Sequence, residues 1–113
     1  MMYIDFKAGD KNYKLRLGTR DIIALEKSIG MNPISIFGDG TTIPSLTIMI
    51  NILHASLQKF HHGISLTDAY DIFDDYIADG NSMTDFLTVI IDIYRVSGIF
   101  TDEERNKEEN EKN

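Results

Sequence analysis

The sequence predicts an α+β fold that is mostly helical: an N-terminal β-hairpin, a small bundle of four to five helices, and an acidic disordered tail. Three patterns predict this arrangement. Apolar and charged residues alternate in the hairpin region, apolar residues recur at helical spacing over residues 43–62, and no apolar residue follows position 101. We therefore expect one globular domain at residues 1–101 and a disordered tail at residues 102–113.

Length, cysteine content and charge narrow the class of protein. The chain has 113 residues, which suits one domain, and it has no cysteine for disulfides or thiolate metal sites. The net charge is −7, with +2 in residues 1–27, −6 in residues 28–101 and −3 in residues 102–113. Nucleic acids are bound by basic faces, so this distribution argues against a nucleic-acid partner.

No targeting or membrane segment is expected. The N-terminus carries charge early and has no apolar core of a signal peptide. The uncharged residues 40–57 include Pro44 and several hydroxyl and amide groups, and this mixture is typical of a core helix rather than a membrane span.

The predicted hairpin spans residues 2–18, with strands at 2–8 and 12–18 joined by the turn residues 9–12. Each strand has one apolar and one charged face. Two strands alone are marginal in water, so the hairpin either packs on the helices or joins the strands of a neighbour. Its free edges are candidate assembly surfaces.

Two short helices are expected next. Thr19 suits the N-cap of a helix at about 20–29, and Gly30 suits its end. Asn32 is the expected cap of a second helix at 33–37, with Pro33 at its first position. The glycine-rich residues 38–41 are the most flexible-looking linker of the domain.

The helix expected at 43–62 organises the domain. One of its faces carries six apolar residues at helical spacing, namely Leu46, Met49, Ile50, Leu53, Leu57 and Phe60. Ile48 and Ile52 lie off that face, so the helix is apolar over more than half its girth. Such a helix is buried on two sides, either within its own domain or against a partner.

Two capped helices complete the bundle. Ser65 with Asp68, and Ser82 with Asp85, have the spacing of a capping box before helices at about 66–79 and 83–97. The expected buried stripe of the first is Ala69, Ile72, Phe73, Tyr76 and Ile77. The stripe of the second is Phe86, Leu87, Ile90, Ile93 and Tyr94, with Val89 and Ile91 broadening it.

No motif predicts catalysis, a metal or a cofactor. The aspartates after position 70 fail the EF-hand pattern, because Ile77 and Phe86 stand where two oxygen ligands are needed, and a solvated acidic face is the better interpretation. The three histidines would need further ligands to hold zinc. No nucleophile elbow, phosphate loop or dinucleotide fingerprint is present, so we do not expect an enzyme.

The informative feature is a surplus of apolar residues over a single stripe per helix. Five of them are candidates for partner binding: Phe37, Ile48, Ile52, Ile99 and Phe100. Two interpretations remain open. These side chains either close the core of a compact helical domain or form a groove for a partner or for self-association.

Residues 13–100 resemble the tail assembly chaperones of long-tailed phages and prophages of Gram-positive bacteria. The resemblance is carried by Arg20-Asp21 with Leu25-Glu26, Asn32-Pro33, His54-Ala55-Ser56-Leu57, and His61-His62-Gly63 before Asp68-Ala69-Tyr70. These motifs belong to the fold and carry no catalytic meaning.

The resemblance implies a protein that coats the long helical tape measure protein while a tail is built. It further implies action in the cytoplasm of the infected or lysogenic host, absence from the mature virion, and no cofactor. Many such chaperones are also made in a longer form by a programmed ribosomal frameshift, whose extension recruits the tail tube protein. Glu111-Lys112-Asn113 can be encoded with a −1 slippery heptamer, so the chain is hypothesised to be the short product.

The alternative is a homo-oligomeric structural or regulatory protein without catalytic activity that uses the same apolar surface on a second copy of itself.

Overall fold

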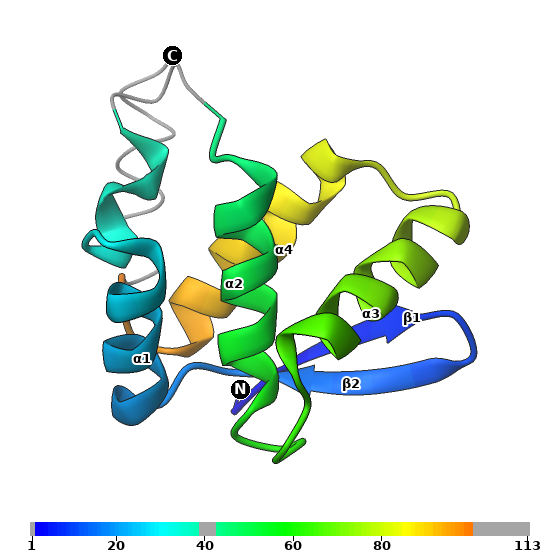
Figure 1. The fold of residues 1–113 in the computed structure, drawn as a ribbon, viewed down its shortest axis with the longest axis horizontal. Helices are drawn as coiled ribbons and strands as arrows, with labels where there is room; N and C mark the ends of the chain where they lie inside the picture. Colours follow the sequence, from blue (N-terminus) through cyan, green and yellow to red (C-terminus); the bar gives the residue numbers. More distant parts are fainter. Residues whose placement is uncertain (1, 39–42, 101–113) are drawn as a thin grey trace.

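A hairpin and a helical bundle make up the computed structural model, which describes residues 2–38 and 43–100. The helices stand on one side of the hairpin (Figure 1). The elements in chain order are β1 (Ile4–Ala8), β2 (Lys11–Leu15), α1 (Thr19–Ile29), the short 3-10 helix η1 (Pro33–Phe37), α2 (Leu46–Leu57), α3 (Leu66–Ala78) and α4 (Met83–Val96). The predicted mostly helical α+β class is confirmed. The predicted tail at 102–113 and most of the predicted linker at 38–41 lie outside the described residues.

The hairpin turn is shorter than predicted. Ala8 pairs with Lys11, so only Gly9 and Asp10 form the turn, and Lys11 already belongs to β2. Gly9 has a φ of 64°, and within the described residues no other residue type has a positive φ. That combination fits a two-residue turn with glycine first, whose twist matches the two strands. The prediction of a four-residue turn is therefore wrong.

Side-chain caps set most of the helix starts. The Ser65–Asp68 and Ser82–Asp85 capping boxes are both formed, with each serine accepting from the aspartate N–H and each aspartate accepting from the serine N–H. Asn32 caps η1 by accepting the N–H of Ile34 at 3.0 Å. These predictions are confirmed.

The predicted cap of α1 is wrong by one residue. Gly18 is the N-cap and Thr19 is already helical. The N–H of Gly18 donates to the carboxylate of Asp21 at 2.9 Å. Because glycine has no side chain, this is only the aspartate half of a capping box.

The central helix α2 is shorter at both ends than predicted. Ser45 caps it by accepting the N–H of Ile48 at 3.2 Å, so Pro44 precedes the helix. After Leu57 the chain turns, and the side-chain amide of Gln58 donates to the carbonyls of His54 and Ile64. Leu46 and Phe60, which were predicted on the core face, are 42% and 37% exposed because they lie at and beyond the helix ends.

The predicted central position of α2 is confirmed. It contacts α1, α3, α4 and β2, and Figure 1 shows it between α1 and α3. Only one stripe of the helix is polar, with Thr47, Asn51, His54 and Gln58 at helical spacing. Apolar side chains on the flanks of that stripe therefore bury the helix on two sides.

Aromatic rings fill the core between the hairpin and the last two helices. Phe6 of β1 stacks on Tyr76 of α3 with 4.9 Å between ring centroids, and Phe86 of α4 meets both rings edge-on. Deeper between η1 and α4, the buried hydroxyl of Tyr94 donates to the carbonyl of Pro33 at 2.9 Å. These contacts fix the hairpin and η1 against the bundle.

Candidate functional site

The five residues predicted to bind a partner do not form one surface. Ile52 is fully buried in the core (0% exposed), so a partner cannot reach it in the folded protein. Ile52 is therefore not a residue of a partner-binding surface, because α2 packs on neighbours on both sides. The other four, Phe37, Ile48, Ile99 and Phe100, are half-buried and pack against the core.

Two of the predicted residues meet around one aromatic ring. Phe37 and Phe100 each contact Tyr94 edge-on, at centroid distances of 6.1 and 6.2 Å. The apolar segment after α4 thus closes the end of the core beside η1. Of the two interpretations left open by the sequence, closing the core describes Ile52, Phe37 and Phe100 better than a groove does.

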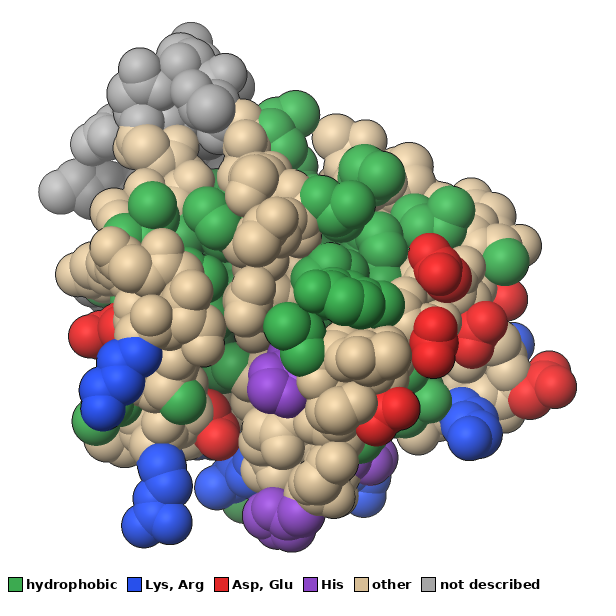
Figure 2. Space-filling view, viewed as in Figure 1, with side chains coloured by type: hydrophobic (Ala, Val, Ile, Leu, Met, Phe, Trp, Pro, Cys, Tyr) green, Lys and Arg blue, Asp and Glu red, His purple; other side chains and the backbone are tan. Residues whose placement is uncertain are grey.

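A further apolar surface lies on α3. Leu66, Tyr70 and Ile77 follow one another at i, i+4 and i+11, so they form a line along one flank of the helix. Tyr70 is 50% exposed, and the other two are half-buried. Figure 2 shows hydrophobic side chains gathered on the face over α2 and α3 and between the two helices. We call this surface, defined by Leu66, Tyr70 and Ile77 of α3, the α2–α3 face.

Sequence reasoning missed the α2–α3 face because it counted apolar residues only toward the core. Tyr70 and Leu66 fall outside the predicted stripe of α3, and Ile77 was placed inward. The signal was available, since the apolar arc of α3 is wider than the stripe that it buries.

Negative charge borders the α2–α3 face. Helix α3 carries four aspartates and no basic residue, and Asp74 lies four residues after Tyr70, which places the two on neighbouring turns. Figure 2 shows acidic side chains beside the hydrophobic area. In α4, Arg95 forms an ion pair with Asp92 at 2.9 Å.

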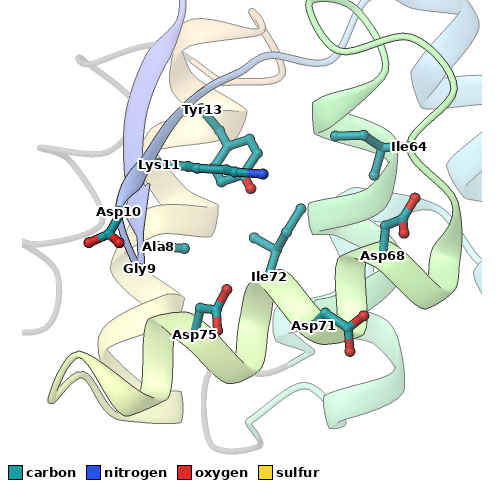
Figure 3. Close-up of a pocket in the computed structure, with 10 residues that line it drawn as sticks. All are labelled: Ala8, Gly9, Asp10, Lys11, Tyr13, Ile64, Asp68, Asp71, Ile72 and Asp75. Carbon is teal, nitrogen blue, oxygen red and sulfur yellow. The ribbon is translucent and has the colours of Figure 1, made fainter.

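A second feature is an open pocket of about 620 Å³ between the hairpin turn and the opposite flank of α3. Its walls combine Lys11 and Tyr13 of β2 with Asp68, Asp71 and Asp75 of α3 (Figure 3). Burial raises the pKa of Tyr13, and the nearby Asp75 and Asp68 raise it further. Within the described residues no three histidine or acidic side chains converge as metal ligands.

The histidines serve the fold separately. The Nε2 atom of His54 is 3.0 Å from the carbonyl oxygen of Ile64. The Nε2 atom of His61 accepts the backbone N–H of Lys14, and its ring packs on Tyr13. The structure therefore does not bring His54 and His61 together on one ligand.

Comparison with known proteins identifies a family whose function is unknown. Residues 4–113 match the model of a family of unknown function, DUF6096. The chain belongs to this family. No curated protein and no solved structure matches this DUF6096 member. In the ranges 2–38 and 43–100, no helix combines the length and apolar character needed to cross a membrane.

Proposed function

We propose that this protein is a tail assembly chaperone that binds apolar helices of a tape measure protein through the α2–α3 face. The observation that carries the proposal is the apolar line Leu66–Tyr70–Ile77 on α3, in which Tyr70 is 50% exposed and the other two residues are half-buried. The resemblance of residues 13–100 to tail assembly chaperones supplies the partner. In this role the protein acts in the host cytoplasm, without turnover or cofactor, and leaves before the virion is complete.

The dimensions of the α2–α3 face suit an amphipathic helix. Residues 66 and 77 of α3 are eleven positions apart, which is about 16 Å along the helix axis. A partner helix docks on such a line with apolar residues on about three successive turns. Tyr70 in the middle supplies a large, half-exposed ring, and aromatic anchors near the centre of an interface contribute most to affinity.

The charge of α3 selects among partner helices. Because Asp74 lies one turn after Tyr70 and α3 has no basic residue, the face favours helices with Lys or Arg beside their apolar stripe. Each such contact is weak on its own. A long target with many similar helices would hold many copies, and linked weak sites gain about 10²–10⁴ in overall affinity.

The test is co-expression with the tape measure protein of the phage or prophage that encodes the chain. The chain should keep that protein soluble and co-purify with it. Tyr70→Asp should lower co-purification at least about tenfold, since it removes the central anchor and adds charge. The matched control is Ile23→Asp on α1, which alters a similarly exposed residue (48%) away from the face.

Two outcomes would contradict the proposal. In one, the tape measure protein stays insoluble and unbound when the chain is present. In the other, the tape measure protein co-purifies equally with the Tyr70→Asp and Ile23→Asp variants, which would show that it does not bind at the α2–α3 face.

A further inference from the structure

The two edges of the hairpin differ in their backbone hydrogen bonds. On the outer edge of β2, the N–H of Lys14 donates to His61 Nε2 at 2.9 Å, and the N–H of Arg16 just beyond it donates to the carbonyl of Ser56 at 3.0 Å. The end of α2 and the turn after it therefore occupy this edge. The sequence-based view that both edges are free is wrong for β2.

The outer edge of β1 has no such cover among the described residues. Asp5 pairs with Lys14 in register, and Lys14 points its N–H away from β1. In an antiparallel pair, the backbone groups of two directly opposite residues either bond to each other or both point out of the pair, and these two arrangements alternate along the strand. The N–H and C=O groups of Asp5, and of Lys7 two residues later, therefore point away from β2. Within residues 2–38 and 43–100, neither N–H has a hydrogen-bond partner.

The side chains of this edge are self-complementary. Asp5 and Lys7 are exposed, and Phe6 between them is buried against the bundle. If a second β1 runs antiparallel with its two-fold axis at Phe6, each Asp5 stands opposite a Lys7 of the other copy. The outward backbone groups of these residues then meet in four N–H···O=C bonds.

Charge excludes the neighbouring registers. An axis at Asp5 sets Asp5 against its own copy, and an axis at Lys7 sets Lys7 against its own copy. Like charges directly opposite each other destabilise a strand pair, whereas opposite charges stabilise it. A two-fold axis between two residues would place a residue whose backbone groups point outward opposite one whose backbone groups point toward its own β2, so no hydrogen bonds could form. The register centred on Phe6 is thus the two-fold pairing in which both charges and hydrogen bonds match.

We propose that β1 is a homodimerisation edge, at which two copies of this chain form a continuous four-stranded antiparallel sheet in the order β2-β1-β1-β2. Lysine on a strand edge commonly prevents unwanted pairing. Because Asp5 stands two residues before Lys7, the charges disfavour pairing with an apolar strand but are complementary to those of a second, antiparallel β1. A two-fold axis normal to the sheet keeps both helical bundles on one side.

Self-pairing does not depend on helix binding, because the α2–α3 face lies on the flank of α3 away from the hairpin pocket. A dimer would carry two such faces. The interface is small, since it adds four backbone hydrogen bonds and two ion pairs, so we expect a reversible dimer rather than an obligate one.

The test uses sedimentation velocity on the full chain, from micromolar to about 1 mM. Wild type should shift from monomer to dimer as concentration rises. Asp5→Lys and Lys7→Asp should each raise the dissociation constant about tenfold or more, because each sets like charges opposite each other twice. Lys11→Asp, which makes the same charge change at the exposed far end of β2, should dimerise like wild type.

The decisive sample mixes the two single variants. In an Asp5→Lys copy paired with a Lys7→Asp copy, every cross-strand pair is again opposite in charge, so a heterodimer should form where neither variant dimerises alone. Amide exchange should also slow at Asp5 and Lys7 as concentration rises. A wild type that stays monomeric to about 1 mM, single variants that dimerise normally, or a mixture that stays monomeric would each overturn the proposal.

Discussion

His61 accepts the backbone N–H of Lys14 through its Nε2 atom at 2.9 Å, and this bond joins the turn after α2 to the outer edge of β2. The acceptor role requires a neutral imidazole, because a protonated ring has no lone pair to offer. Burial lowers the pKa of His61, and the nearby Lys14 lowers it further.

The bond predicts a pH dependence of stability. The folded-state pKa of His61 lies below its unfolded value of about 6.5, so the unfolded chain binds more protons. The stabilisation is therefore complete above pH of about 6.5 and is lost as pH falls through the folded-state pKa. Urea unfolding should therefore give a smaller free energy of unfolding at about pH 5 than at about pH 7.5.

A glutamine at position 61 separates this effect from other titrations. His61→Gln keeps an acceptor but cannot protonate, so it should lose less stability between the two pH values than wild type does. His62→Gln, at an exposed neighbour, should behave like wild type. An equal loss in all three proteins would show that His61 is not the source.

The two capping boxes predict separable costs. Ser65→Ala and Ser82→Ala should each lower the free energy of unfolding by about 1 kcal/mol, because each leaves an N–H at a helix start without its acceptor. Ser28→Ala is the control, since its hydroxyl donates only to the carbonyl of Ala24 inside α1. Thermal unfolding measures all three, and equal midpoints for the cap and control variants would refute the assignment.

The hairpin turn depends on one carboxylate. The N–H of Gly9 donates to Asp79 Oδ2 at 2.8 Å, across seventy positions of sequence. Asp79→Ala should therefore speed exchange of the Gly9 amide and cost about 1 kcal/mol. Asp74→Ala removes another exposed aspartate of the same region and should leave that amide unchanged. An unchanged Gly9 exchange rate in Asp79→Ala would contradict the role of the bond.

Ile52 belongs to the core rather than to a binding surface. Ile52→Ala should lower the free energy of unfolding by about 2–5 kcal/mol, because the side chain is fully buried and leaves a cavity. Ile48→Ala should cost less, since Ile48 is half-buried. Urea unfolding of the two variants gives the comparison, and similar losses at both positions would contradict the burial assigned to Ile52.

Local patterns were sufficient for much of the fold. Alternation predicted the hairpin, serine–aspartate spacing predicted the starts of α3 and α4, and Asn32-Pro33 predicted η1. Each of these signals lies within a few residues of the feature that it predicts. The ends of α2 were missed because they depend on the Ser45 cap and on the bridge that Gln58 makes to Ile64.

Surfaces were harder to predict than elements. The period of a helix shows which residues share a face but not how wide a face its neighbours cover. The sequence therefore left open whether Ile52 lies in the core, and the flank of Tyr70 was overlooked. Likewise, the sequence showed a hairpin with two edges. Only long-range contacts from His61 and Ser56 determine that β2 is covered while Asp5 and Lys7 on β1 are not.

The most direct test of helix binding is an NMR titration of the isotope-labelled chain with a synthetic amphipathic helix taken from the tape measure protein of the same phage or prophage. The account predicts that the largest shift changes fall on Leu66, Tyr70 and Ile77 of α3, while Ile23 on α1 stays unchanged. No change at any concentration, or changes centred on α1, would contradict the α2–α3 face as a helix-binding surface.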